Sequence, residues 1–230
     1  VTNDMDLLAN QPAMHAALLT PQGKILFEFF VVKAAGGYLL ETGADQAAGL
    51  AKRLAMYKLR AKATIEHTNE RYRICAAWGA EPPRLDATVV FADPRSAALG
   101  WRAVFDGATI APTRTAAAYD AHRIALAIPE GGKDYDFGDA FPHEANFDLL
   151  HGVGFEKGCY VGQEIVSRMQ HRATVRKRIV RVAGAAALPV SRPDIKIGAV
   201  VIGKLGSVEG KQGLAMLRLD RAIEAIDKGE

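Results

Sequence analysis

Short apolar segments alternate with turn residues at the start of the chain, a pattern typical of antiparallel strands. Apolar residues at 14–19 and 24–32 flank the turn sequence TPQG at 20–23. Proline at the second turn position and glycine at the fourth favour a type I turn, so the sequence predicts a β-hairpin. A second turn at 35–37 leads to a third short strand at 38–41.

The next segment of the chain has the spacing of a helix. Apolar residues recur at that spacing over 46–61, behind Asp45, which suits a helix N-cap. A second helix, with Thr113 as its cap and an apolar stripe from Ala117 to Ile128, ends at Pro129. Four more strands are expected between the two helices, at 63–68, 72–78, 87–91 and 102–105.

The second half of the chain has a different texture. Residues 131–150 show little periodicity, and a long loop inside a folded domain usually has a function or is mobile. After residue 174, β-rich pieces at 178–183, 197–204 and 213–219 are separated by Gly, Pro and Ser. We therefore predict an α+β body over 1–174, with antiparallel sheets and packed helices, followed by a small β-barrel or sandwich over 175–230.

Composition narrows the class of protein. Apolar residues make up 49% of the 230 residues and charged residues 24%, ordinary values for a folded globular chain. The net charge of +3 gives no reason by itself to expect nucleic acid. No membrane span or signal peptide is visible. Cys75 and Cys159 are the two cysteines, so we expect a reducing, cytoplasmic compartment, although the sequence leaves their pairing open.

The most distinctive segment is EKGCYVGQE at 156–164, which places Cys159 between glycines and charged residues. Lys157 and Arg168 would favour the thiolate of Cys159 if they surround it in space. The alternative is a small apolar residue buried in a turn. No second Cys or His stands at ligand spacing, so no metal site is predicted.

Three other features have both a functional and a plain structural interpretation. Arg123 follows Asp120 by three residues, which suits either an ion pair on a helix or an arginine that grips a ligand carboxylate. Glu144 and Asn146 could hold a heterocycle or simply shape a loop. The basic run at 168–181 could contact RNA or form a solvated edge strand.

These motifs carry a family resemblance. KGCYVGQE at 157–164, followed by IVSRMQHR, resembles the signature of YgfZ-type folate-binding proteins, which are relatives of the glycine-cleavage T-protein, an aminomethyltransferase. LLTPQGKILFEFFV at 18–31, HRIALAIPEG at 122–131 and FPHEANFD at 141–148 resemble other segments of that family in the same order. VTND at the start is similar to the end of a family segment, so a further strand–helix unit is expected upstream.

The resemblance implies a T-protein-like folate-binding body arranged around a central pocket, with a small C-terminal β-barrel. It further implies binding of tetrahydrofolate or a one-carbon derivative. The implied role is to help assemble or repair iron–sulfur clusters, including those of tRNA-modifying enzymes, with assembly or client proteins as partners. Cys159 would be a reactive thiol. The cofactor-binding residues would be Lys157, Gly158, Tyr160, Gly162, Gln163, Glu164, Glu144, Asn146 and Arg123.

One departure from the T-protein bears on catalysis. The family's pair of aspartates after the hairpin turn corresponds to Phe27 and Glu28 here. The longer side chain of Glu28 would place its carboxylate elsewhere, and an error of about 1 Å can cost on the order of a hundredfold in rate. A folate-dependent aminomethyl or one-carbon transferase that uses Glu28 is therefore the alternative function. RNA contact through residues 168–181 is the third hypothesis.

Overall fold

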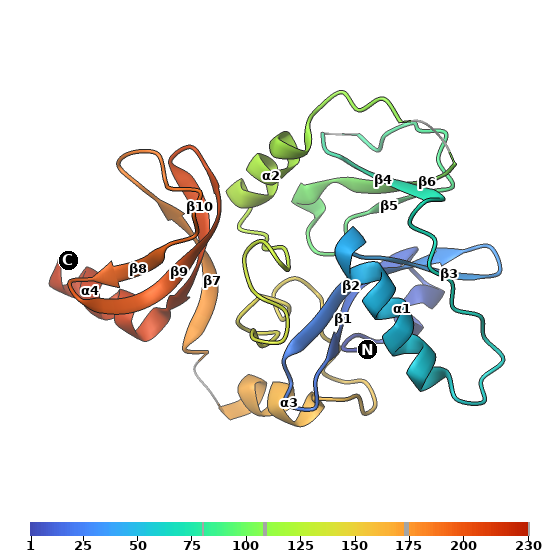
Figure 1. Cartoon of the computed structure of the whole chain (residues 1–230), viewed down its shortest axis with the longest axis horizontal. Coiled ribbons are helices and arrows are strands. Elements are labelled where there is room, and N and C mark those ends of the chain that lie inside the picture. Colours follow the sequence, from blue (N-terminus) through green and yellow to red (C-terminus); the bar gives the residue numbers. More distant parts are fainter. Residues whose placement is uncertain (80, 108–109, 173–174, 230) are drawn as a thin grey trace.

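A computed structural model describes residues 1–79, 81–107, 110–172 and 175–229. Figure 1 shows three antiparallel sheets arranged around a central segment that has little regular structure. The first sheet has the order β1-β2-β3, the second β4-β6-β5 and the third β7-β10-β9-β8. The α+β body with packed helices and the β-rich C-terminal unit agree with the prediction. The expected boundary at residue 174 lies outside the described residues and stays a prediction.

The predicted hairpin is confirmed. The first sheet consists of β1 (Ala13–Leu19), β2 (Ile25–Ala34) and β3 (Gly37–Glu41). Strand β2 is buried on both faces because its alternate residues meet different partners. Phe27, Phe29 and Val31 pack in one cluster with Leu50 of α1 (Ala44–Lys58), a helix predicted at 46–61. Phe30 and Val32 pack against the second sheet instead.

The second sheet consists of β4 (Tyr72–Ala77), β5 (Val89–Ala92) and β6 (Trp101–Asp106). All three strands were predicted, but the strand expected at 63–68 was wrong: these residues form no ladder and only two of them are even partly buried. The short helices η1 (Met5–Ala9) and η2 (Ala97–Leu99) flank the strands of the body. Helix α2 (Ala116–Ala125) begins two residues later than predicted, because the Thr115 side chain accepts the cap hydrogen bond from Ala118 N.

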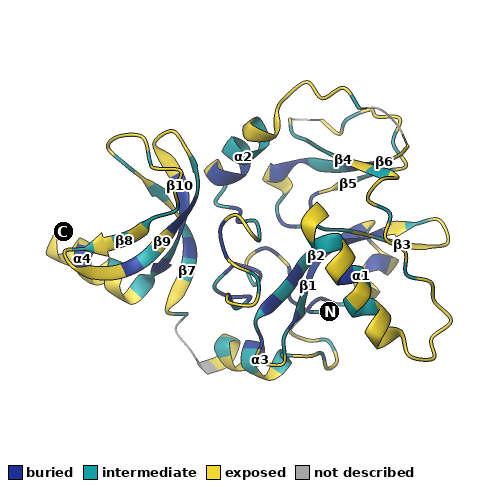
Figure 2. Cartoon of the chain, viewed as in Figure 1, coloured by how far each residue is buried: buried dark blue, intermediate teal, exposed yellow. Residues whose placement is uncertain are grey.

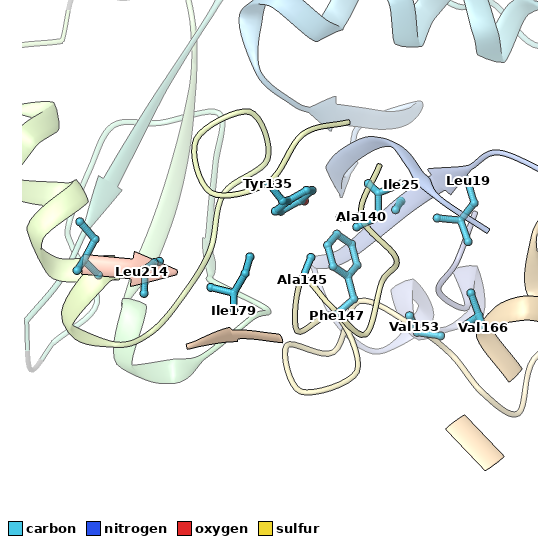
Figure 3. Packing of buried hydrophobic residues seen from close by; sticks show 12 residues of the cluster. Leu19, Ile25, Tyr135, Ala140, Ala145, Phe147, Val153, Val166, Ile179 and Leu214 are labelled. Atoms are coloured by element: carbon cyan, nitrogen blue, oxygen red, sulfur yellow. The ribbon is translucent and has the colours of Figure 1, made fainter. Parts of the chain in front are cut away.

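The central segment from Leu126 to Gly162 forms no helix or named strand, yet much of it is buried (Figure 2). Figure 3 shows the cluster that this segment organises between the hairpin and the C-terminal sheet. Its buried residues are Ala17, Leu19, Ile25, Ile124, Tyr135, Ala140, Ala145, Phe147, Val153, Val166, Ile179 and Leu214. The predicted long loop therefore forms part of the core.

The chain continues through α3 (Gln163–Arg172) into β7 (Lys177–Ala183), β8 (Asp194–Ile197), β9 (Val200–Glu209) and β10 (Gln212–Arg218). Helix α4 (Leu219–Lys228) follows without a loop and was not predicted. Hydrogen bonds to the backbone of Ile179 join this C-terminal sheet to the body. Ile179 N donates to Glu144 O at 2.9 Å, and Asn146 Nδ2 donates to Ile179 O at 2.9 Å.

Candidate functional site

A cavity of about 1100 Å³ lies beside the second sheet, between β4 and β6 on one side and the segment leading into α2 on the other. This volume is slightly above the usual range of pockets that hold drug-sized ligands. Its wall carries the aromatic residues Trp78, Phe105 and Tyr119 together with Ile74 and Leu85. The Trp78 ring is stacked on His122 of α2, at 5.1 Å between centroids and 12° between planes, so α2 covers one face of the ring.

A buried ion-pair network forms one side of the cavity. Arg102 lies beside Glu41, with Nε donating to Oε2 at 3.1 Å, and its Nη1 lies 3.3 Å from the Tyr119 hydroxyl. Arg95 donates to the same hydroxyl at 2.9 Å and pairs with Asp93 at 2.8 Å. Burial would raise the pKa of Asp93, but the hydrogen bond from Arg95 lowers it below its ordinary value. The network is therefore charged and fixed in place.

The outer part of the cavity is lined by further arginines. Arg71 is paired with Asp106, with Nε donating to Oδ1 at 2.8 Å. Arg73 donates through Nη1 only to carbonyl oxygens, including that of Glu70 at 3.0 Å. Arg114 forms no hydrogen bond or ion pair within the part of the chain that the structure describes. Two cations therefore face the cavity with no carboxylate partner among the described residues.

Cys75 also lines this cavity, from β4. Burial raises the pKa of its thiol, which favours the neutral form. A second, smaller groove of about 430 Å³ lies between β3, α1 and residues 64–69. Both cysteines are free, so no disulfide joins Cys75 and Cys159.

The cysteine motif lies elsewhere, at the turn of the β1–β2 hairpin, and lines neither cavity. Cys159 is exposed. Gly162 has φ +83, and a Cβ on it would lie 2.7 Å from Thr20 O, so only glycine fits both the backbone angle and the contact with the hairpin turn. The Gln163 side chain accepts a hydrogen bond from Tyr160 N at 3.3 Å and so stabilises the start of α3.

The remaining residues of the motif fix its position or face solvent. Lys157 Nζ donates to Val1 O at 3.2 Å and lies 4.9 Å from the centre of the Tyr160 ring. Glu164 is exposed, 3.7 Å from Arg168. A Cβ on Gly158 would meet no atom within 4 Å. The motif therefore presents its cysteine on a short surface loop that the hairpin supports.

Glu144 and Asn146 act at the joint between the body and the C-terminal sheet. The Glu144 carboxylate accepts a hydrogen bond from Phe141 N at 2.9 Å. Asn146 takes φ +63 and also accepts from Arg178, which forms a two-pronged ion pair with Asp148 at 2.9 Å. Neither residue lines a described cavity. Arg178 of the basic run is thus used inside the molecule.

Arg123 is fully buried and joins α2 to the central segment and to β9. The predicted ion pair with Asp120 is present at 2.7 Å, and Nη1 lies 2.6 Å from Asp134 Oδ2. Nη2 donates to Ser207 Oγ at 2.6 Å, and Nε lies 3.3 Å from Glu130. Burial would lower the pKa of Arg123, but Asp134 and Glu130 raise it above its ordinary value. Protein groups engage each of its three nitrogens.

Glu28 lies in a closed network between the hairpin and the central segment. His15 Nε2 lies 3.0 Å from Oε1, while the Tyr135 hydroxyl and Gly131 N donate to Oε2 at 2.7 and 2.9 Å. Burial would raise the pKa of Glu28, but the hydrogen bond with His15 and the charges of His15 and Arg95 lower it to about 2. Its carboxylate is ionised, saturated with donors, and outside both cavities.

Sequence reasoning missed the residues of the cavity wall. Arg102 was predicted only as the start of a strand, and Glu41 only as the end of one. The available signal was a charged residue within each short strand, because such a charge needs a partner when its face is covered. Trp78 and Tyr119 had no distinguishing spacing, since the fold alone brings β4 and α2 together.

Neither a metal-binding cluster nor a membrane-spanning helix is found among the described residues. No group of three or more His, Cys, Asp or Glu side chains is placed to hold a metal ion. Within the same part of the chain, every helix is too short or too polar to cross a bilayer.

Comparison with known proteins identifies the family. Residues 176–229 match the family described as the CAF17 C-terminal beta-barrel domain. The mouse protein named mitochondrial iron–sulfur cluster assembly factor IBA57 is 33% identical over 241 residues, covering 91% of this chain and 67% of the mouse protein. The chain belongs to the CAF17/IBA57 family. The human member of the family is 32% identical over 231 residues, a region that makes up 89% of this chain and 64% of the human protein.

Other matches set the limits of this assignment. The mitochondrial IBA57 homolog of Mycosarcoma maydis is 33% identical over 193 residues, which is 48% of its length. The chain thus spans about half to two thirds of these relatives. The glycine cleavage system aminomethyltransferase T of Bartonella henselae matches with a TM-score of 0.66 and 13% identity, covering 91% of this chain and 69% of that one. This match confirms the T-protein-like fold.

The family corrects one prediction. The chain was expected in the cytoplasm, but these relatives are named as mitochondrial proteins, so that expectation is wrong. The physical reason is that two free cysteines indicate only a compartment that keeps thiols reduced. Cysteine content does not distinguish one reducing compartment from another.

Proposed function

We propose that this chain is a tetrahydrofolate-binding accessory protein that helps to assemble or repair iron–sulfur clusters. The observation that carries the folate part is the cavity beside the second sheet. It combines aromatic walls, a buried Arg102–Glu41 pair and two outer arginines without carboxylate partners among the described residues. Those are the groups expected of a site for a flat heterocycle with an acidic tail.

The residues present fit a reduced folate. Trp78 and Tyr119 offer ring surface to a pterin. Arg73 and Arg114 supply cations for the glutamate carboxylates, while Glu41 and Arg102, which engage each other, form part of the cavity wall. When bound, the folate would bring one-carbon chemistry. The chain's own residues would bind and orient it.

The cluster part of the proposal rests on family membership, because the named relatives are iron–sulfur cluster assembly factors. The exposed Cys159 supports it further. Thiolates are the usual protein ligands of iron–sulfur clusters, and this thiol lies on the surface, away from the folate cavity. We therefore propose that Cys159 faces a partner protein or its cluster. In this role Lys157, Gly162 and Gln163 hold the loop that presents it.

The finer predictions stay proposals. The assignment to the YgfZ type rests on the cysteine motif, as does the expectation that tRNA-modifying enzymes are among the clients. A site for folate at Lys157, Gly158, Tyr160, Gly162, Gln163 and Glu164, together with Glu144, Asn146 and Arg123, has no support from the cavities described above. No observation favours the transferase that would use Glu28, because protein groups already engage its carboxylate.

Isothermal titration of 5-formyltetrahydrofolate into the full chain tests the folate proposal. Stacking on an aromatic side chain is worth about 1–3 kcal/mol, so Trp78→Ala should weaken binding about 5- to 150-fold. Tyr57→Ala is the control, because Tyr57 is an exposed aromatic residue that lines neither cavity. Absence of binding at millimolar ligand would exclude the proposal, and equal losses in both variants would exclude this cavity.

The cluster proposal needs a separate assay. Cells depleted of their own family member are supplied with the wild-type chain or with Cys159→Ser, and the activity of a [4Fe–4S] enzyme is measured. Val190→Ser is the control, since Val190 is exposed and lines neither cavity. The proposal predicts loss of activity with Cys159→Ser alone. Full activity with Cys159→Ser would exclude a role for this thiol.

A further inference from the structure

The end of α1 and the chain that follows it project from the body with apolar side chains in solvent. Every residue from 55 to 64 is exposed, and Figure 2 shows this part of the chain at the outer edge of the molecule. Met56 is 63% exposed, Tyr57 52% and Leu59 88%. All three lie outside both cavities. Single exposed apolar residues are common on protein surfaces, but three so close together in the chain mark a contact site.

The same segment is strongly basic. No acidic residue lies between Asp45 and Glu66, whereas the cations there are Lys52, Arg53, Lys58, Arg60 and Lys62. None of these cations makes a side-chain hydrogen bond or an ion pair with the part of the chain that the structure describes. Their charges therefore add to one positive field around the exposed apolar residues.

The packing of α1 places both kinds of side chain on the outer surface. Leu50 is buried under the first sheet, and Leu54 packs against the same cluster. Because a helix has about 3.6 residues per turn, Lys52 and Met56 lie one turn apart on the opposite face. The helix ends at Lys58, and the residues after it continue as exposed chain.

We infer that this segment, residues 52–62, binds the surface of an anionic phospholipid bilayer. The cations would meet lipid phosphates while the apolar side chains enter the boundary of the acyl region. A bilayer accepts projecting side chains of any shape. A protein interface, in contrast, needs a closely packed core in which lysine is rare. The inference concerns where the protein works and is independent of folate binding.

Co-sedimentation with vesicles of phosphatidylcholine, alone or mixed with phosphatidylglycerol, tests the inference. The wild-type chain should bind only the anionic vesicles. Each cation near such a surface strengthens binding about fivefold, so Lys58→Gln/Lys62→Gln should weaken it about 30-fold. Met56→Ser/Leu59→Ser keeps every cation and should weaken binding about 10- to 100-fold, because two apolar side chains no longer enter the lipid.

Lys196→Gln/Lys211→Gln is the matched control, because it removes two exposed lysines of the C-terminal unit. It should bind as the wild type does, and all variants should keep the wild-type thermal melt. Absence of wild-type binding to anionic vesicles would overturn the inference. An equal loss in both lysine variants would do the same, because binding would then follow net charge alone. If Met56→Ser/Leu59→Ser binds as tightly as the wild type, the segment fits an acidic protein instead.

Discussion

The buried guanidinium of Arg123 offers the sharpest test of how α2, the central segment and the C-terminal sheet are held together. Its side chain is 0% exposed and that of Asp134 is 1% exposed, with 2.6 Å between Nη1 and Oδ2. Arg123→Met keeps an apolar side chain of similar length but leaves the Asp134 charge uncompensated. Removing one partner of a buried pair costs about 3–5 kcal/mol. We expect a loss of that size in the free energy of unfolding.

Urea unfolding at neutral pH, followed by circular dichroism, measures this loss. Arg218→Met is the control, because the Arg218–Asp220 pair has a similar distance of 2.8 Å but side chains that are 39% and 44% exposed. It should leave the unfolding midpoint nearly unchanged, since solvent screens such a pair. Adding Asp134→Asn to Arg123→Met should recover part of the loss. Equal effects of Arg123→Met and Arg218→Met would refute the argument from burial.

Three further predictions concern the motif and the buried carboxylate. Gly162→Ala should cost about 1–3 kcal/mol of stability in thermal melts, because a Cβ would overlap the hairpin turn, whereas Gly158→Ala, in open space, should cost nothing measurable. The pKa of Glu28 is lowered from 4.5 to about 2. The Glu28 carboxylate therefore adds to the free energy of unfolding above pH 4.5, and this contribution is lost as the pH falls toward 2. In Glu28→Gln, the free energy of unfolding should therefore fall less between pH 4.5 and pH 2 than it does in the wild type. An equal fall in both proteins would contradict this assignment. Finally, iodoacetamide should label Cys159 in the native protein well before Cys75, because Cys159 is exposed and burial raises the pKa of the Cys75 thiol. Mass spectrometry measures the order of labelling. Earlier labelling of Cys75 would contradict the exposure of Cys159.

Periodicity and turn chemistry predicted most of the strands, α1 and α2, because those signals are local. The turn at 20–23 carried its own proline and glycine, and the stripe on α1 needed only one apolar face. The strand expected at 63–68 failed because alternation in sequence creates no ladder unless a partner strand lies beside it. Helix α4 was missed because β10 runs into it without a turn residue to mark the change.

The candidate site was less predictable than the fold. Cys159 stood out because a motif surrounds it, and the structure gives part of that motif a packing role at the hairpin turn. The cavity, in contrast, is assembled from β3, β4, β6 and the start of α2. Its wall residues, such as Trp78 and Arg114, lie far apart in sequence and share no spacing. Only the tertiary arrangement brings them to one place.

The irregular central segment has a consequence for how the molecule comes apart. It packs on the hairpin and the C-terminal sheet through Tyr135 and Phe147, and on the connection beside the second sheet through Ile128 and Leu150. Among the described residues no sheet shares a strand with another. The central segment joins the body to the C-terminal sheet, and the first and second sheets also pack directly on each other through Phe30 and Val32. Because each sheet packs on the central segment or on a neighbouring sheet, loosening one sheet exposes buried surface of the others. Heating should therefore give one calorimetric peak rather than a separate peak for each sheet.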